Sequence, residues 1–127
     1  MKCLLVDDSK TMRIIQRSAL ASIPGIEFAE AGDGVEALAA MARTPGGFTF
    51  AIVDWNMPNL DGISLIKKVR ETDRRTLLIM VTTEAEKPRV LDAIRAGVNN
   101  YLIKPFDATE LLQKVQQTLE KAKAAAA

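Results

Sequence analysis

Apolar stretches alternate with amphipathic stretches five times along this chain, and this alternation constrains the fold more than any other feature. Each apolar stretch is short and stops at a polar or turn-forming residue, which is typical of a buried strand. The intervening stretches carry apolar residues at helical spacing, such as Met12, Ile15 and Ala19. Strands are expected at residues 2–6, 26–30, 48–53, 76–81 and 100–103. This alternation favours an α/β fold, in which helices cover both faces of a doubly wound parallel sheet of five strands.

Capping residues mark where the helices of this pattern begin and end. Asp33 and Asp107 each precede a glutamate by three residues, which is the capping-box spacing at a helix start. Gly97 suits the position just past a helix end, where the backbone often turns left-handed. No repeat and no polar linker divides the 127 residues. We therefore expect one domain over residues 1–127, ending in a disordered alanine-rich tail over residues 122–127.

The charge balance and the scarcity of certain residues exclude several classes of function. The chain has 17 Lys and Arg and 16 Asp and Glu, so its net charge of +1 gives no field for holding nucleic acid phosphates. No apolar run approaches the ~20 residues of a bilayer span, and no signal peptide precedes Asp7. Cys3 is the single cysteine and histidine is absent, which excludes an internal disulfide, a multi-cysteine zinc site and histidine-based catalysis. We expect a cytoplasmic monomer that binds neither nucleic acid nor membrane.

Polar side chains stand at the carboxyl ends of four of the five expected strands. They are Asp7 with Asp8, Asp54, Thr82 and Lys104. In an open α/β sheet, ligands bind outside the carboxyl ends of the strands. A single residue of this kind is readily explained as a helix cap or a solvated loop residue. Four such strand ends at one edge of a sheet indicate a functional site instead.

Three of these side chains are carboxylates, and their chemistry predicts a phosphorylated aspartate. Carboxylates brought close together repel one another and raise each other's pKa, and a divalent cation relieves that repulsion. A small set of oxygen ligands suits Mg²⁺, which keeps several of its own waters. One carboxylate oxygen can then attack phosphorus, while the cation, a lysine ammonium and a threonine hydroxyl neutralise the phosphoryl oxygens.

Short motifs in a fixed order make the chain similar to a known family. They are Leu4-Leu-Val-Asp-Asp-Ser9, Val53-Asp-Trp-Asn-Met-Pro58, Asp61-Gly62, Val81-Thr82, Tyr101 and Lys104-Pro-Phe106. Over residues 2–121 the sequence resembles the receiver domain of two-component response regulators, most closely the stand-alone chemotaxis type. The resemblance implies a flavodoxin-like (β/α)5 fold with strand order 2-1-3-4-5.

The resemblance also implies a role for each residue at the strand ends. Asp54 would be the phospho-acceptor, and Lys104 and Thr82 would stabilise the phosphoryl group. The Mg²⁺ ligands would be Asp8, Asp54 and the backbone carbonyl of Asn56, with Asp7 bound through a water molecule. The Lys104-Pro105 peptide bond would be cis, as in the family.

A second group of residues would carry the response to phosphorylation. Thr82 and Tyr101 would form the switch, and Asn56 and Glu84 would tune the lifetime of the phosphoryl group. The output surface would comprise Lys87, Val90, Asn99, Tyr101, Ile103 and Lys114. The chain departs from the family at Thr83, because the residue after the switch threonine is usually small. A β-branched side chain at that position could narrow access for the phosphodonor.

The resemblance implies a phosphorylation-dependent signalling switch and not an enzyme that turns over external substrates. A sensor histidine kinase would supply the phosphoryl group. The chain would then dock to an output target, such as the flagellar motor switch in chemotaxis. Two alternatives stay open, namely a shuttle in a phosphorelay and a receiver-fold interaction module that needs no phosphate.

Two further patterns point to other classes of protein and are weaker. The stretch Gly32–Ala37 matches a dinucleotide-binding fingerprint, but it follows the second expected strand instead of the first. A phosphatase similar to the haloacid dehalogenases would need a second aspartate where Asn56 stands. We therefore expect neither nucleotide binding nor turnover of phosphate esters.

Overall fold

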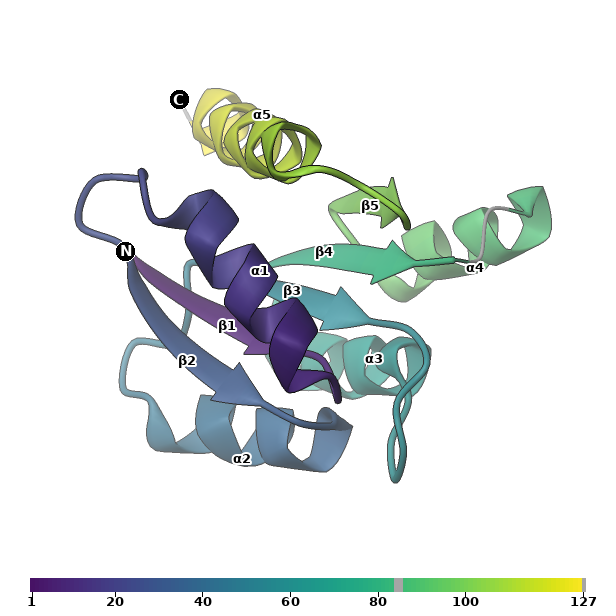
Figure 1. Cartoon of the computed structure of the whole chain (residues 1–127). Helices are drawn as coiled ribbons and strands as arrows, with labels where there is room; N and C mark the ends of the chain where they lie inside the picture. The colour runs from purple at the N-terminus through teal and green to yellow at the C-terminus, as the bar shows by residue number, and fades with distance from the viewer. Residues whose placement is uncertain (84–85, 127) are drawn as a thin grey trace.

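The computed structural model describes residues 1–83 and 86–126, and its central layer is a sheet of five strands. The strands are β1 (Lys2–Val6), β2 (Glu27–Ala31), β3 (Phe50–Asp54), β4 (Leu77–Thr82) and β5 (Asn100–Ile103). Their order is β2-β1-β3-β4-β5, as the family resemblance implied. Every neighbouring pair is parallel, so the carboxyl ends of all strands lie at one edge of the sheet (Figure 1).

Five helices cover the two faces of this sheet. They are α1 (Lys10–Leu20), α2 (Gly34–Arg43), α3 (Gly62–Thr72), α4 (Lys87–Ala96) and α5 (Ala108–Ala126). Helices α1 and α5 lie on one face, and α2, α3 and α4 lie on the other (Figure 1). The arrangement confirms the doubly wound α/β fold that the alternation of strands and helices predicted.

Two apolar layers bury the sheet, one on each face. Successive side chains of a strand point to opposite faces, so each strand contributes to both layers. The layer beneath α2, α3 and α4 includes Leu4, Val53, Met80, Leu65 and Ile66. The layer beneath α1 and α5 includes Leu5, Ile52, Ile79, Leu111 and Val115. Because β3 and β4 are covered on both faces, they are almost continuously apolar in sequence.

The predicted caps hold the helix ends in place. The Asp33 carboxylate accepts a hydrogen bond from the Glu36 amide at 2.8 Å, and Asp107 does the same for the Glu110 amide at 2.8 Å. Gly97 follows α4 with a φ of 115°, the left-handed conformation that glycine adopts readily. The capping predictions are therefore confirmed.

The carboxyl end of the chain differs from the prediction. The expected disordered tail over residues 122–127 is wrong for residues 122–126, because α5 continues through Ala126. Alanine has the highest helix propensity of all residues, so a run of alanines prolongs a helix that is already formed. Ala127 lies outside the described residues. Among the described residues, no helix combines the length and the apolar character needed to span a bilayer.

Candidate functional site

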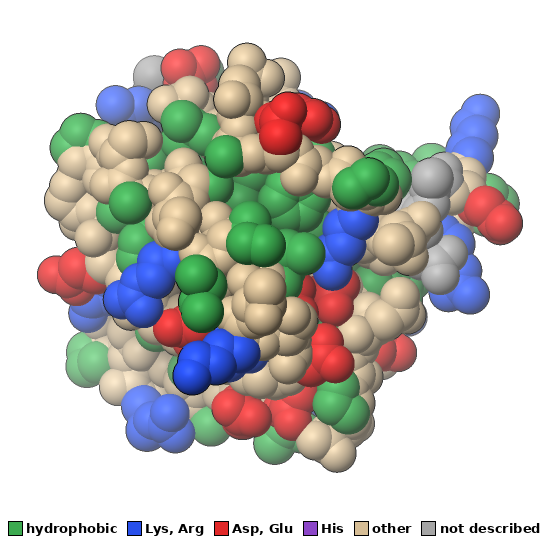
Figure 2. Space-filling view, viewed as in Figure 1, with side chains coloured by type: hydrophobic (Ala, Val, Ile, Leu, Met, Phe, Trp, Pro, Cys, Tyr) green, Lys and Arg blue, Asp and Glu red, His purple; other side chains and the backbone are tan. Residues whose placement is uncertain are grey.

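Three aspartates meet at the carboxyl edge of the sheet. Asp7 and Asp8 follow β1, and Asp54 is the last residue of β3. Strands β1 and β3 are neighbours with Val6 paired to Val53, so the residues that follow these two valines emerge side by side. One carboxylate oxygen from each aspartate lies within 4.8 Å of the other two. In the space-filling view, acidic side chains gather beside the ends of these two strands (Figure 2).

The environment of this cluster disfavours the charged form of two of its members. Asp7 is 1% exposed and Asp54 is 6% exposed, whereas Asp8 faces solvent. Burial raises the pKa of the Asp54 carboxyl above its ordinary value, and the negative charge of Asp7 adds to this effect. Burial likewise raises the pKa of Asp7, although the Ser9 amide and the Lys104 ammonium oppose the shift. Positive charge beside the cluster would therefore favour the ionised form of both carboxyls.

Lys104, the residue that follows β5, places a positive charge beside these carboxylates. Its ammonium Nζ lies 3.2 Å from Asp54 Oδ1 and 3.6 Å from Asp7 Oδ2. The Lys104 amide donates to the Thr82 carbonyl at 2.8 Å, which continues the pairing of β5 with β4 and fixes where the lysine leaves the sheet. The Lys104-Pro105 peptide bond is cis, as expected from the family.

The donor set of the cluster fits a hard divalent cation. Asp7 Oδ1 accepts a hydrogen bond from the Ser9 amide at 2.8 Å, but the buried Asp7 Oδ2 has no hydrogen-bond partner among the described residues. The 3.6 Å ion pair with Lys104 is too long for a hydrogen bond, and a buried carboxylate oxygen that accepts none is costly, so a cation at this position would satisfy it. All ligand atoms on offer are oxygens, which is the donor type that Mg²⁺ prefers.

The loop between β3 and α3 carries Asn56 and is fixed by two hydrogen bonds. The Gly62 amide donates to the Trp55 carbonyl at 2.8 Å, which joins the two ends of the loop, and a Cβ at position 62 would collide with the Asp54 carbonyl oxygen. Within the loop, Asn59 Nδ2 donates to Asp33 Oδ2 at 2.6 Å. This hydrogen bond ties the loop to the start of α2.

The Asn59–Asp33 hydrogen bond was missed by the sequence analysis, which treated Asp33 only as a helix cap. The Glu36 amide and the Asn59 side chain together hold the pKa of Asp33 below its usual range. Asn59 adopts a φ of 66°, and asparagine is among the non-glycine residues that tolerate this conformation best. The Pro58-Asn59 pair signals a turn, but its partner 26 residues away is not visible in the sequence.

The expected switch residues lie close to the aspartate cluster in the sheet. Thr82 is the last residue of β4 and is fully buried, and it pairs with Ile103 of β5. Tyr101 pairs with Met80 and is partly buried, with its ring packed against the apolar layer beneath α2, α3 and α4. Asn56 and Thr83 are exposed, whereas Glu84 lies outside the described residues.

The expected output residues are distributed over α4, β5 and α5. Lys87 and Val90 lie on α4, Tyr101 and Ile103 on β5 and Lys114 on α5, and each of these residues has some exposure to solvent.

The side chain of Asn99 is engaged in a structural contact. Asn99 Oδ1 accepts from the Leu78 amide at 2.8 Å and from Arg70 Nη2 at 2.9 Å. Arg70 also donates through Nε to the Gly97 carbonyl at 3.0 Å, so it connects α3 to the end of α4. Whether these six residues act as one surface stays a prediction.

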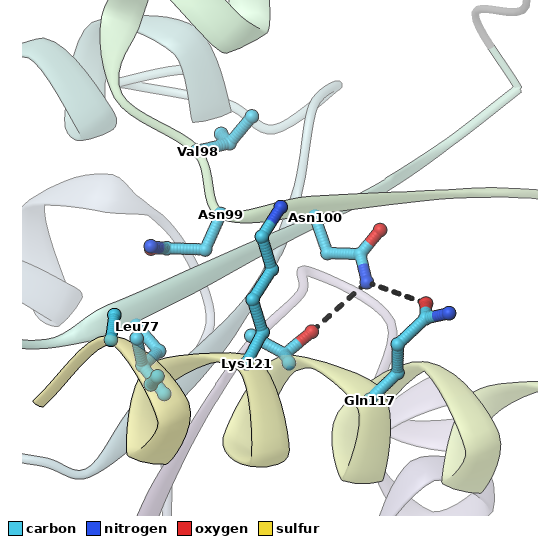
Figure 3. A pocket seen from close by; sticks show the side chains of 9 residues that line it. Leu77, Val98, Asn99, Asn100, Gln117 and Lys121 are labelled. Atoms are coloured by element: carbon cyan, nitrogen blue, oxygen red, sulfur yellow. Dashed lines mark hydrogen bonds between the residues drawn. The ribbon is translucent and has the colours of Figure 1, made fainter. Parts of the chain in front are cut away.

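A pocket of about 580 Å³ lies at the opposite end of the sheet from the aspartates. It is lined by residues at the start of β4 and β5 and by the last turns of α5 (Figure 3). Asn100 Nδ2 donates there to Thr118 Oγ1 at 3.0 Å and to Gln117 Oε1 at 3.3 Å. Since these amide and hydroxyl groups satisfy one another, the pocket offers less chemistry than the aspartate cluster.

Comparisons with known proteins agree with this geometry. The family model for the response regulator receiver domain matches residues 3–116. The sequence is 42% identical over 123 residues to the chemotaxis protein CheY of Pseudomonas aeruginosa, covering 95% of this chain and 98% of that protein. It is 38% identical to the chemotaxis protein CheY-3 of Vibrio cholerae, covering 95% of this chain and 93% of that protein.

Solved structures show the same likeness. The chemotaxis response regulator CheY4 of Vibrio cholerae superposes with a TM-score of 0.84 at 34% identity, covering 92% of this chain and 97% of that chain. The receiver domain of the Francisella response regulator 1452 gives a TM-score of 0.84 at 30% identity, covering 94% of this chain and 97% of that chain.

Proposed function

Because this chain belongs to the response regulator receiver domain family, we propose that Asp54 accepts the phosphoryl group that operates its switch. The chain is accordingly a signalling switch and not an enzyme that turns over external substrates. One observation carries the assignment of Asp54. Its carboxylate shares a site with those of Asp7 and Asp8, and the Lys104 ammonium lies 3.2 Å from Asp54 Oδ1.

The reaction at Asp54 transfers a phosphoryl group from a donor to a carboxylate oxygen. An Asp54 carboxylate oxygen forms a bond to phosphorus while the bond from phosphorus to the donor atom breaks, and the electron pair of that bond leaves with the donor. Bound Mg²⁺ would neutralise charge on the phosphoryl oxygens. Asp8, Asp54 and the Asn56 carbonyl would hold it directly, and Asp7 would hold it through a water molecule.

Two side chains near Asp54 would respond to the new phosphoryl group. The Lys104 ammonium, which now pairs with Asp54, would pair with a phosphoryl oxygen. The Thr82 hydroxyl would donate a hydrogen bond to another phosphoryl oxygen. Movement of Thr82 would alter the space beside Tyr101, because Thr82 ends β4 and Tyr101 lies on the adjacent β5, paired with Met80. The switch would therefore pass from Asp54 through β4 to β5.

The partners follow from the family and from the relatives' names. A sensor histidine kinase would donate the phosphoryl group, since the family belongs to two-component systems. The relatives named as chemotaxis proteins support a role in chemotaxis, with the flagellar motor switch as the output target. In this role the chain would act as a cytoplasmic monomer over a single domain, residues 1–127.

Intact mass measurement tests the assignment of Asp54. The protein is incubated with Mg²⁺ and acetyl phosphate, and we expect the wild type to gain one phosphoryl group. The variant Asp54→Asn retains the size of the side chain but loses the nucleophilic oxygen, so we expect it to gain none. Full phosphorylation of Asp54→Asn would overturn the assignment. A wild type that gains no phosphoryl group would instead favour an interaction module that needs no phosphate.

A further inference from the structure

A groove of about 470 Å³ runs between α3 and α4, and none of the expected switch and output residues lines it. Its walls are formed by Ile63 and Lys67 of α3 and by Arg89, Asp92 and Arg95 of α4, and Trp55 lies at its base. Trp55 is 4% exposed and follows Asp54 directly in the sequence. The groove is therefore built partly on the loop that carries the phospho-acceptor.

The groove carries more positive than negative charge. Three of its lining residues are cations and one is an anion. Across residues 1–83 and 86–126, no carboxylate lies within ion-pair distance of Lys67, Arg89 or Arg95. The three cations are also exposed, so their charges are available to a ligand from solvent.

The floor of the groove determines which kind of anion fits it. The Arg89 guanidinium lies over the Trp55 ring, 5.5 Å from the ring centroid, so that ring is already stacked on a cation. A nucleobase needs an open aromatic face to stack on, and Trp55 does not offer one. Ile63 and Ala96 add apolar surface beside the ring, which suits an aliphatic side chain.

We propose that the α3–α4 groove docks an acidic segment of a partner protein, in which carboxylates flank an aliphatic side chain. The carboxylates would pair with Lys67 on one wall and with Arg89 and Arg95 on the other. The aliphatic side chain would rest against Ile63 and Ala96. The expected output surface also uses α4, through Lys87 and Val90, but none of its residues lines the groove. The proposed docking does not depend on phosphorylation of Asp54.

Nuclear magnetic resonance of the unphosphorylated, magnesium-free protein tests the proposal. The probe is a capped peptide of eight residues that alternates glutamate with leucine, and the matched control peptide has glutamine in place of every glutamate. We expect the acidic peptide to shift the Trp55 indole signal and the backbone signals of α3 and α4 around the groove. We expect the glutamine peptide to leave them unchanged.

Charge-reversal variants locate the binding surface. Lys67→Glu combined with Arg95→Glu removes two groove cations, and we expect affinity for the acidic peptide to fall about tenfold or more. Lys121→Glu combined with Lys123→Glu makes the same change in net charge at the far end of α5, and we expect it to preserve the affinity. Because all four side chains are exposed, these variants should fold, and their spectra would show it. Lys67→Gln with Arg95→Gln repeats the test without charge reversal.

Three results would overturn the proposal. The first is an acidic peptide that binds nowhere or shifts signals on β5 and α5 instead of the groove. The second is equal binding of the glutamine peptide. The third is an equal loss of affinity in the groove variants and in the α5 variant. Each result concerns the groove alone, because phosphorylation of Asp54 is measured separately by mass.

Discussion

At the scale of single residues, the properties of the site depend on which side chains border Asp54. Burial places Asp54 and Asp7 in an environment that favours protonation, and Lys104 opposes that tendency. The same carboxylate must nevertheless be ionised to attack phosphorus. The cluster holds two more carboxylates than its single lysine can neutralise, and the two positive charges of a divalent cation would balance them.

The lifetime of the phosphoryl group is expected to depend on Asn56 and Glu84. Both side chains are polar and could position a water molecule for attack on phosphorus. We expect Asn56→Met combined with Glu84→Leu to slow loss of the phosphoryl group about tenfold or more, which is the scale of a lost water-positioning group. The measurement is the decay of phosphorylated protein after removal of the donor. An unchanged decay rate would show that these two residues do not control hydrolysis.

Asp73 should make the stability of the chain depend on pH. Burial acts to raise the pKa of Asp73, but hydrogen bonds from Thr76 and Arg75 and the charge of Arg70 outweigh it and lower the pKa. A lowered pKa in the folded state means that the ionised carboxylate stabilises the fold above the unfolded value of ~3.9. That contribution is lost as the pH falls through the folded pKa.

The variant Asp73→Asn isolates this contribution. It removes the charge that accepts hydrogen bonds from the Thr76 hydroxyl at 2.6 Å and the Arg75 amide at 2.8 Å. We expect a loss of about 1 kcal/mol in the free energy of unfolding at pH 7. The loss should shrink as the pH is lowered below ~4, because the wild-type carboxylate then becomes neutral as well. Urea unfolding at several pH values measures it, and a constant difference between pH 7 and pH 3 would contradict the expectation.

At the scale of helices and strands, the sequence predicted the types of the elements better than their buried faces. In α1, Ile15 was placed on the apolar side, yet it is 46% exposed, while the neighbouring Gln16 is 1% exposed. Adjacent residues on a helix differ by about 100° in direction, so the rotation of the helix about its axis decides which of the two is buried. The packing of α1 against α5 and the sheet sets that rotation, and neither partner is visible in the sequence of α1 alone.

The candidate site was more predictable than the contacts that support it. Asp7, Asp8, Asp54, Thr82 and Lys104 stand at strand ends, so a correct strand pattern is enough to bring them to one edge. The order of the strands came only from the family resemblance, because spacing does not say which strands are neighbours. The Asn59–Asp33 hydrogen bond joins two loops far apart in the sequence and could not be inferred.

The Asn59–Asp33 hydrogen bond should influence metal binding by fixing the loop that carries Asn56. Asn59→Gly removes the donor but suits the φ of 66°, so we expect little change in the free energy of unfolding. We expect the affinity for Mg²⁺ to fall about tenfold, which is typical when a group that orients a metal ligand is lost. Fluorescence of the single tryptophan, Trp55, reports the titration. Equal Mg²⁺ affinities for variant and wild type would show that the loop does not need this contact.

At the scale of the whole molecule, the proposed switch joins the centre of the sheet to its edge. Asp54 ends the central strand β3, and Tyr101 lies on the edge strand β5, with β4 between them. A phosphoryl group at Asp54 could thus change the surface two strands away without altering the fold. Such a change affects output only if a partner binds one state more tightly than the other.

A stable phosphoryl mimic tests this route. We expect beryllofluoride with Mg²⁺ to move the partly buried Tyr101 ring further inward and to shift signals from Lys87 to Ile103. We also expect a partner peptide to bind this face more tightly, and a tenfold gain would correspond to a coupling of about 1.4 kcal/mol. A crystal or nuclear magnetic resonance comparison of free and mimic-bound protein measures both effects. An unmoved ring and unchanged signals would exclude this surface as the output.

Arg70 anchors the carboxyl-terminal end of α4. Its guanidinium fixes the end at Gly97 to α3 and, through Asn99, to β4. Among the described residues, the start of α4 at Glu86 has no side-chain cap. A rigid helix held at its Gly97 end would turn about that end, so the displacement caused by a movement at its start would be largest at Lys87 and smallest at Ala96. Amide hydrogen exchange along α4 should follow this gradient, and Arg70→Ala should flatten it by releasing the pivot.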